Sequence, residues 1–378
     1  MDLELSQEQE MVRDTVSGLV QKFCPLDVVR QLEDDPFGYS DNLWQQLADS
    51  GVTGMLIPEE YGGSSMTMLD AAVAYIEFGR SLAPTPHFVS SVMAAGVLLH
   101  AGTDAQKQAW LPKLADGSAV ITTAWMEPDR GFGPDGVALA ATADGEGFVL
   151  TGTKRHVTFA SAADRLLVLA KSDAGLLLAL VDPKADGVTL TQQFSVSSDT
   201  QYRVDFKAVK VSAADVIGAA GSGWETWDAV MRDGLILLAA QAAGGARYSL
   251  EITTQYAKDR KQFDKPLGAF QALAHYLADA VTTVDGAEAL VFEAAWARTE
   301  GRSVAKLAPM AKLFACQTYR DVTAMAQQVF GGIGFTVDFD IQLYFRRAKQ
   351  LQITWWDDRY LEELVAEQLL AEAAARAS

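Results

Sequence analysis

The sequence has little cysteine and a deficit of positive charge. Cys24 and Cys316 are its two cysteines, and they lie far apart without the C-x-x-C or histidine-paired spacing of metal sites. We therefore expect neither a disulfide framework nor a zinc site, and interpret both residues as buried thiols. Lys and Arg total 31 against 49 Asp and Glu, giving a net charge of −18. Because this charge repels phosphate backbones and anionic lipids, binding to nucleic acid or to membrane surfaces is not expected.

Long apolar runs are also missing. No run of 18 apolar residues occurs, and the first residues, MDLELSQEQE, are acidic without an apolar segment. Neither a membrane span nor a secretory signal is supported, and a cytoplasmic location is the expectation. Core material is plentiful, since hydrophobic residues make up 49% of the chain. A chain of 378 residues exceeds the size at which one core keeps growing, so two or three packed regions are expected.

The hydrophobic period changes twice along the chain. Residues 5–117 have a helical pattern that begins with a serine cap and capping-box glutamine in SQEQEMVRDTVSGLVQKF. From about residue 120 to 216, short runs such as DRLLVLAK and GLLLALVDP alternate with Gly, Asp and Pro, as strands do. Helical periodicity then returns, with Phe270, Leu273, Leu277 and Val281 on one face. The sequence therefore predicts a mostly α protein with a central β-domain, divided into residues 1–117, 118–217 and 218–378.

Some stretches carry residues suited to binding a cofactor. DRKQFDKPLGAFQ (259–271) places Arg260 between two predicted helices, where a planar guanidinium suits a pyrophosphate, although a solvated turn also explains this stretch alone. QQVFGGIGF (327–335) has glycines that let backbone N–H groups approach a ligand, although alone it favours a helix C-cap. TTAWMEPDRGFGPDG and GTKRHVTFASAADRLLVLAK belong to the β-domain, and His156 alone is typical of a partly exposed histidine.

In this order and spacing the stretches resemble the acyl-CoA dehydrogenase family. IPEEYGG, RKQFDKPLGAFQ, QVFGGIGF and YFRRAKQLQI carry the resemblance, which covers essentially the whole chain. It implies an N-terminal helical domain, a middle β-barrel or sandwich, and a C-terminal four-helix bundle, with FAD bound between subunits of a dimer. It also implies that a carboxylate removes the α-proton of an acyl-CoA while the β-hydride passes to flavin N5.

Both positions where the family places that carboxylate lack a basic group here. Aligning FRRAKQLQITWWDD on the family's Y-E-G-T segment puts Trp355 at the glutamate, and the position used by a minority of members falls at Gly234. An indole N–H donates but has no basic lone pair, and glycine has no side chain. The resemblance therefore implies no catalytic residue in this chain.

The resemblance also divides the cofactor-binding residues into changed and retained groups. On the flavin side, Met126 replaces a threonine and His156 a tryptophan, whereas Thr158 is retained. The residues that reach the FAD pyrophosphate and adenosine across the family's dimer are all present, so the implied cofactor-binding set is Thr158, Arg260, Phe263, Gln271, Gln328, Gly331 and Gly332. A chain that has lost its own flavin-facing groups but kept those it lends to a neighbour is expected in a heteromeric assembly.

This pattern is similar to that of paired subunits in steroid-degrading acyl-CoA dehydrogenases, which form α2β2 tetramers from two different chains. We predict that a second such chain supplies the glutamate for α,β-desaturation of a bulky acyl-CoA, for example a steroid side-chain thioester. Two alternatives stay open: a self-sufficient enzyme that uses Asp233 or Asp357 as its base, and a protein that kept the fold without FAD.

Overall fold

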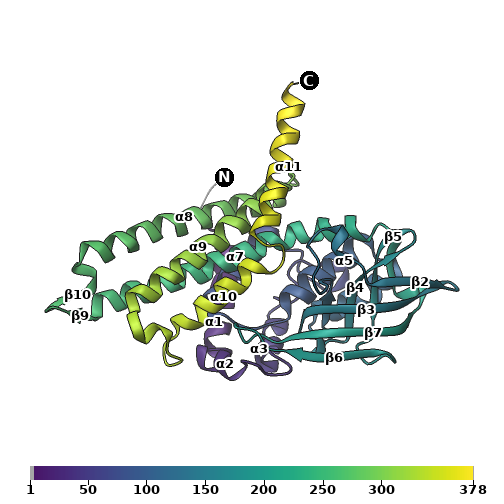
Figure 1. Cartoon of the computed structure of the whole chain (residues 1–378), viewed down its shortest axis with the longest axis horizontal. Helices are drawn as coiled ribbons and strands as arrows, with labels where there is room; N and C mark the ends of the chain where they lie inside the picture. Colours follow the sequence, from purple (N-terminus) through teal and green to yellow (C-terminus); the bar gives the residue numbers. More distant parts are fainter. Residues whose placement is uncertain (1–3, 378) are drawn as a thin grey trace. The chain divides into compact units, whose positions relative to one another are not determined.

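The computed structural model describes residues 4–377, which form two compact units. The helical unit contains the residues up to Leu26, Met68–Ala83 and the residues from Leu235 onward. The β-containing unit contains Asp27–Thr67 and Pro84–Gly234. Along the chain, helices precede a central sheet and long helices follow it (Figure 1), which confirms the predicted fold class. The division into three domains at residues 117/118 and 217/218 stays a prediction.

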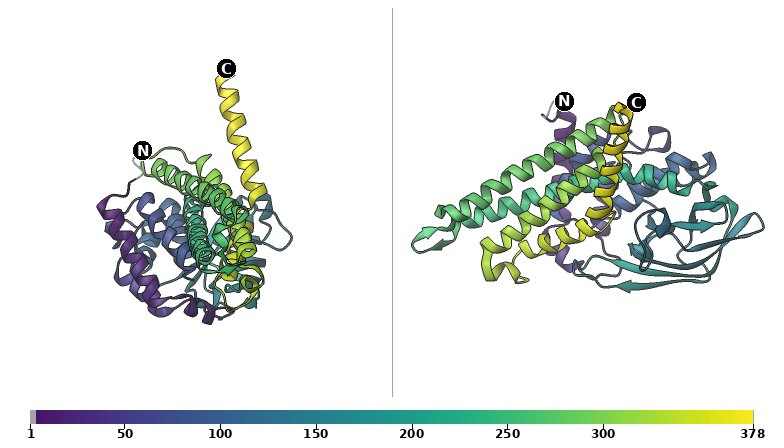
Figure 2. Two further views of the ribbon diagram at one scale, coloured as in Figure 1. Left: turned by 90° about the vertical axis from the view of Figure 1, so that its left-hand side faces the viewer. Right: turned by 45° about the horizontal axis from the view of Figure 1, so that its top comes forward.

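The helical unit is built on long helices that run alongside one another (Figure 2). Its elements are α1 (Gln7–Phe23), α4 (Met68–Ser81), α7 from Leu235 (whole helix Gly223–Asp259), α8 (Gln271–Thr299), α9 (Leu307–Phe330), α10 (Ile341–Ile353) and α11 (Asp358–Ala377). The predicted capping box is present, because Ser6 and Gln9 exchange side-chain to backbone hydrogen bonds at the start of α1. Glycine is needed where α4 meets α7, since a Cβ on Gly244 would lie 2.0 Å from the carbonyl oxygen of Ile76.

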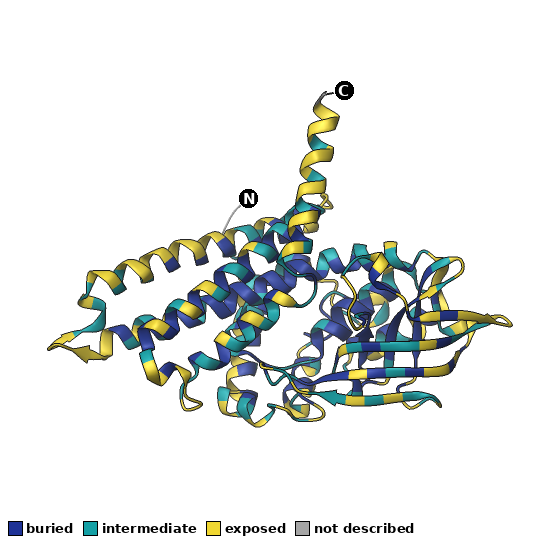
Figure 3. Ribbon diagram, viewed as in Figure 1, coloured by how far each residue is buried: buried dark blue, intermediate teal, exposed yellow. Residues whose placement is uncertain are grey.

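The buried face of α8 differs from the face predicted from the sequence. Its buried residues are small or branched and recur at helical spacing: Ala280, Val284, Ala287 and Val291. Leu273 and Leu277 are half-buried, and Val281 is 43% exposed. The prediction followed the largest apolar residues, whereas the α8–α9 contact uses small ones that allow the helices to approach closely. One side of α8 is therefore exposed (Figure 3), and it carries Tyr276 and Val281 among polar residues.

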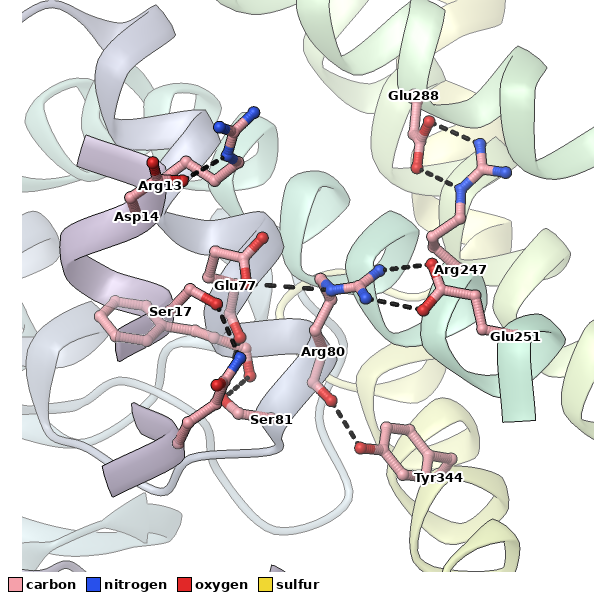
Figure 4. Close-up of polar contacts among 12 residues, drawn as sticks. Arg13, Asp14, Ser17, Glu77, Arg80, Ser81, Arg247, Glu251, Glu288 and Tyr344 are labelled. Atoms are coloured by element: carbon pink, nitrogen blue, oxygen red, sulfur yellow. Dashed lines mark hydrogen bonds and ion pairs between the residues drawn. The ribbon is translucent and has the colours of Figure 1, made fainter. Parts of the chain in front are cut away.

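Two arginines join α4, α7 and α8 (Figure 4). Arg80 on α4 donates to both carboxylate oxygens of Glu251 on α7, at 2.9 and 2.7 Å. Arg247 on α7 donates to Glu288 on α8 at 2.8 and 2.6 Å, and also to Asp285. Isolated exposed ion pairs contribute about 0–1 kcal/mol, but planar two-point contacts in a connected series also fix the register of the helices.

The β-containing unit carries the sheet and the shorter helices. The helical elements are α2 (Leu26–Gln31), α3 (Asp41–Asp49), a π-helix η2 (Phe88–Ala94), α5 (Ala95–Ala101) and α6 (Asp104–Ala115). The strands are β1 (Ile121–Ala124), β2 (Ala140–Asp144), β3 (Gly147–Thr158), β4 (Arg165–Ser172), β5 (Gly175–Val181), β6 (Val188–Gln193), β7 (Gln201–Val211) and β8 (Val216–Gly221). Their order is β6-β7-β3-β2-β4-β5-β8, and β1 pairs in parallel with β4.

Two further expectations concern the thiols and the membrane. Both cysteines are buried and free, as predicted, and burial raises the pKa of the Cys24 thiol to about 11. Across residues 4–377, no helix is long and apolar enough to cross a membrane.

Candidate cofactor site

Arg260, Phe263 and Gln271 lie at one corner of the helical unit. Arg260 directly follows α7, and a short hairpin of β9 (Lys261–Gln262) and β10 (Lys265–Pro266) leads to Gln271, the first residue of α8. Phe263 and Asp264 form the turn with φ values of +53° and +64°, as two-residue hairpins require. The backbone N–H of Leu267 donates to the Arg260 carbonyl at 2.8 Å and closes the loop. The sequence predicted the two helix ends but not this hairpin.

The glycine segment lies at the same end of the helical unit. α9 ends at Phe330, whose ring stacks on Tyr256 of α7 with 4.3 Å between centroids. The carbonyl of Tyr256 in turn accepts the N–H of Arg260 at 2.8 Å. The structure therefore brings Arg260 near the C-terminal end of α9, where Gln328 is exposed. Gly331 is the C-cap residue with φ +68°, so the helix-cap interpretation of this segment also holds.

The backbone around Gly331 and Gly332 is open. A Cβ added to either glycine would have no protein atom within 4 Å, whereas a Cβ on Gly334 would lie 2.5 Å from Oε1 of Gln327. The first two glycines thus leave room for a group from outside this chain, and the third is needed for packing. With the exposed guanidinium of Arg260 beside it, this end of the unit suits an anionic ligand.

The Trp355–Trp356 segment is held in a strained conformation by a buried lysine. Both tryptophans have positive φ, +53° and +69°, which large side chains rarely adopt. Lys312 on α9 is fully buried, and its Nζ donates to the carbonyls of Leu351, Thr354 and Trp356 at 3.1, 2.9 and 2.8 Å. Burial lowers the pKa of Lys312. This lysine therefore caps α10 and fixes the direction of the chain at Trp355.

The two aspartates after the tryptophans have structural roles. The Asp357 carboxylate accepts the backbone N–H of Tyr360 at 3.0 Å, which is the contact of a helix N-cap. Asp358 accepts the side-chain amides of Gln352 and Gln317 at 2.6 and 3.3 Å. Asp358 thus joins α11 to α9 and α10, and Asp357 caps α11, a role that needs no catalytic explanation.

Gly234 lies in a closed part of the β-containing unit. A Cβ there would lie 3.0 Å from Sδ of Met93 and 3.1 Å from the ring of Phe88, both on the π-helix η2. A carboxylate side chain at residue 234 would therefore need these side chains to move. The neighbouring Asp233 is half-buried.

A buried ion pair that the sequence did not reveal holds the segment around Met126. Nζ of Lys154, on β3, lies 2.7 Å from Oε1 of Glu127 and 3.0 Å from the carbonyl oxygen of Trp125. Burial lowers the pKa of Lys154 to about 8, although the attraction of Glu127 acts against that shift. The backbone N–H of Arg155 donates to the Met126 carbonyl at 3.0 Å. Residues 125–127 are thus tied to β3 at several points.

The next residues of β3 include His156 and Thr158. His156 is exposed and has φ +54°, at a shift of register between β3 and β7. Thr158 is half-buried, and its carbonyl accepts the hydroxyl of Thr122 at 2.6 Å. Of the expected cofactor-binding residues, those of the helical unit share one end of that unit, and Thr158 belongs to the other unit.

Comparison with known proteins identifies the family. Helices that precede and follow a central sheet along the chain define a protein of helix–sheet–helix architecture. The chain matches the N-terminal, middle and C-terminal domains of acyl-CoA dehydrogenase over residues 6–118, 122–209 and 221–370. The chain therefore belongs to the acyl-CoA dehydrogenase family, a family of oxidoreductases.

Individual relatives match along nearly their whole length. Probable acyl-CoA dehydrogenase YngJ of Bacillus subtilis is 30% identical, covering 98% of this chain and 100% of that protein. A chain of the ChsE4–ChsE5 complex from Mycobacterium tuberculosis is 27% identical with a TM-score of 0.90, covering 98% and 99%. A chain of the steroid ACAD Tcur3481–Tcur3483 is 30% identical with a TM-score of 0.87, covering 98% and 99%.

FAD is the cofactor of this family. The helical unit fits it, because an exposed guanidinium and a backbone segment that a Cβ would not crowd occur at one end. Arg260, Gln328, Gly331 and Gly332 are the residues suited to the pyrophosphate and adenosine. When bound, FAD supplies the acceptor for a hydride.

Proposed function

We propose that this chain is the subunit without a base in a heteromeric, FAD-dependent acyl-CoA dehydrogenase. A second acyl-CoA dehydrogenase-like chain supplies the glutamate that removes the α-proton, and the complex desaturates a bulky acyl-CoA such as a steroid side-chain thioester. The observation that carries the proposal is a difference between the family's base positions in this chain and the expected FAD-binding positions. Gly234 is enclosed by Met93 and Phe88, and Trp355 carries an indole on a backbone held by Lys312. In contrast, Gly331 and Gly332 have open space around them.

Two features support a partner chain. The expected pyrophosphate residues are exposed on the outer end of the helical unit, and the hairpin turn presents Phe263 at 86% exposure. One side of α8 is also exposed, and it carries the large side chains of Tyr276 and Val281, which are 52% and 43% exposed. A second subunit would bury these side chains and complete the FAD site. Among the similar structures, ChsE4–ChsE5 is a complex of two chains and Tcur3481–Tcur3483 is called a steroid ACAD.

The roles of this chain's own residues follow from their contacts. Arg260 holds the pyrophosphate by a two-point, charge-assisted contact, and the backbone at Gly331 and Gly332 approaches it closely. The Lys154–Glu127 pair keeps Met126 in place at the flavin side. Lys312 holds the backbone on either side of Trp355, at the family's base position, and the indole there has no group that can abstract a proton.

The purified protein distinguishes this proposal from the two alternatives. We expect the chain expressed alone to be colourless or insoluble, and to become soluble and yellow when co-expressed with a chain that carries a glutamate at either base position. A yellow, active protein from this chain alone would instead establish the self-sufficient enzyme with Asp233 or Asp357. A stable chain that stays colourless with every such partner would establish the fold without FAD.

A further inference from the structure

The last helix, α11, has one face that packs on its own unit and another that is exposed. On the packed face, Leu361 and Leu364 are 0% and 7% exposed. Leu369 and Leu370, further along the helix, are 50% and 71% exposed. Figure 1 shows the C-terminal end of α11 projecting away from the other helices of the helical unit. Two large apolar side chains therefore lie in solvent on a projecting helix.

The exposed apolar residues of α11 form a stripe along the helix. Ala366, Leu369, Leu370 and Ala373 are all exposed and recur at spacings of three and four residues, which brings them to one side of a helix. Apolar residues at this spacing are the pattern by which one helix packs against another. The apolar stripe thus indicates a contact between helices that a second chain completes.

The sequence of the apolar stripe reads almost the same in both directions. Residues 366–373 are AEQLLAEA, and reversal changes only positions 368 and 371. A two-fold axis between Leu369 and Leu370 therefore sets leucines against leucines in two antiparallel helices, and Ala366 against Ala373 of a second copy. A two-fold contact joins the same surface of both copies, so that surface must complement itself. The stripe meets this requirement, which binding to an unrelated chain does not impose.

Charged residues of α11 fit the same antiparallel arrangement. Glu362 and Arg376 are exposed and lie about two helical turns on either side of the axis, so each meets the opposite charge of the second copy. A parallel pairing would instead bring each residue against its own like charge. Glu372 lies on the packed side of the helix, where its carboxylate accepts from Nζ of Lys306 at 2.6 Å. The charges therefore favour the antiparallel direction.

We propose that the apolar stripe of α11 is an interaction surface for the same stripe of a second copy of this chain, in antiparallel two-fold pairing. Three helical turns bury less than the roughly 1,200 Å² of a stable interface, so the pairing forms in an assembly that already holds two copies. This inference rests on the proposed function, since an α2β2 assembly of the predicted kind contains two copies of this chain. In that assembly, α11 joins the two heteromeric pairs.

Symmetric disulfide trapping in the co-expressed complex tests this contact. Cys24 and Cys316 are buried, so cysteines introduced at exposed positions of α11 are the accessible thiols of this chain. Only positions beside the axis bring two copies of one introduced cysteine within the Cβ separation of a disulfide, about 3.5–4.5 Å. After mild oxidation, we expect Leu369→Cys or Leu370→Cys to give at least about tenfold more of a species with twice this chain's mass than Glu367→Cys. Glu367 is the control because it is exposed on another side of α11.

The products of oxidation distinguish the occupants of the stripe. Linkage of neither leucine variant above the control, in a complex that assembles and binds FAD, would overturn the inference and leave the proposed function standing. Linkage to a cysteine of the partner chain, recognised by mass spectrometry, would also overturn it and assign the stripe to that chain. Self-linkage in a yellow, active protein made of this chain alone would support the contact and overturn the proposed function.

Charge reversal tests the direction of the helices. Arg376→Glu sets like charges together at two symmetric contacts, so we expect it to raise the dissociation constant of the tetramer about fivefold to tenfold. Glu362→Arg should have the same effect, and the double variant should restore the parent value. Glu367→Arg, a matched charge change away from the stripe, should leave assembly unchanged. Light scattering over a dilution series measures dissociation, and FAD content should be equal in all variants. Additive losses in the double variant would refute the antiparallel pairing.

Discussion

Arg260 is the expected cofactor-binding residue whose position in the structure best suits its chemistry. It lies exposed after α7, beside a glycine segment with open space, and its guanidinium can donate two hydrogen bonds to one anion. Arg260→Ala should therefore lower the FAD occupancy of the complex roughly tenfold to hundredfold. The ratio of flavin absorbance to protein absorbance measures this occupancy. Lys261→Ala removes a neighbouring charge without a planar fork and should change occupancy much less; equal FAD content in the Arg260 variant would remove Arg260 from the site.

His87 gives the β-containing unit an acid-sensitive point. Its imidazole is 1% exposed, Nε2 lies 2.9 Å from the carbonyl oxygen of Val52, and burial lowers its pKa from 6.5 to about 4. Between pH about 6.5 and about 4, His87 is protonated in the unfolded chain but stays neutral in the folded chain. Stability is therefore lost as the pH falls from about 6.5 to about 4, at up to about 1.4 kcal/mol per pH unit.

Substitution of His87 isolates this effect. In His87→Gln the amide replaces the imidazole N–H and does not titrate, so the fall in melting temperature over that pH range should become shallower. His100→Gln, an exposed histidine, should leave the slope unchanged. An identical slope for the parent and His87→Gln would show that other groups carry the acid sensitivity.

At the scale of elements, the sequence predicted what depends on local pattern. The capped start of α1, the strands β3 to β7 and the two long helices around Arg260 are local in origin, and all are present. The short strands β1 and β8 have little alternation of their own and form through pairing with distant strands, whereas β2 forms a hairpin with the adjacent strand β3. The π-helix η2, whose residues are mostly buried, likewise depends on tertiary packing, whereas the exposed hairpin β9–β10 is local and uses the positive φ values of Phe263 and Asp264.

The residue types of the candidate site were predictable from the sequence, but the buried lysines that hold the surrounding backbone were not. Spacing and resemblance indicated Arg260, Gln328 and the glycines, and the structure places them at one end of a unit. Nothing in the sequence around Lys154 or Lys312 distinguishes a buried lysine from a surface one. Their roles arise only when distant groups converge on each ammonium group: the Trp125 carbonyl and the Glu127 carboxylate on Lys154, and three backbone carbonyls on Lys312.

Lys312 is the support on which the α10–α11 connection depends. Lys312→Met would leave three backbone carbonyls without their common donor, at a cost of about 2–4 kcal/mol. We expect the melting temperature of the complex to fall by about 3–5 °C. Lys306→Met is the control, because Lys306 forms a half-exposed ion pair with Glu372. This variant should shift the melting temperature by no more than about 1 °C. Equal shifts in both variants would contradict the role of Lys312 as the common donor to these three carbonyls.

The same connection allows a test of whether one residue could restore the missing base. Trp355→Glu places a carboxylate at the family's position, on a backbone still held by Lys312. We expect no dehydrogenase activity from this chain alone, because Met126 and His156 still alter the flavin side and the FAD site still lacks its second subunit. The assay is reduction of an electron-accepting dye with acyl-CoA thioesters. Activity from the single chain would show that its pocket is intact.

At the scale of the whole molecule, the two groups of residues suggest a division of labour between chains. Gly234 is buried and has no side chain, Trp355 is half-buried and has no basic group, and the positions that would hold FAD for a neighbour are uncrowded or exposed. A chain that worked alone would need both sets. A fold that had lost FAD would have no reason to keep Arg260 and two uncrowded glycines together. The combination favours a subunit whose contribution is completed by another chain.

This division predicts where the base is found. General-base catalysis contributes roughly 10²- to 10⁴-fold and needs a group within hydrogen-bond reach of the proton. Asp357 is occupied as the N-cap of α11, and Asn can keep that cap, so Asp357→Asn tests its charge without removing its structural contact. In the co-expressed complex, Asp357→Asn and Asp233→Asn should each leave kcat within a few-fold of the parent, whereas replacing the partner's glutamate should abolish turnover. A loss of about hundredfold or more in either aspartate variant, with FAD bound and the assembly intact, would place the base in this chain.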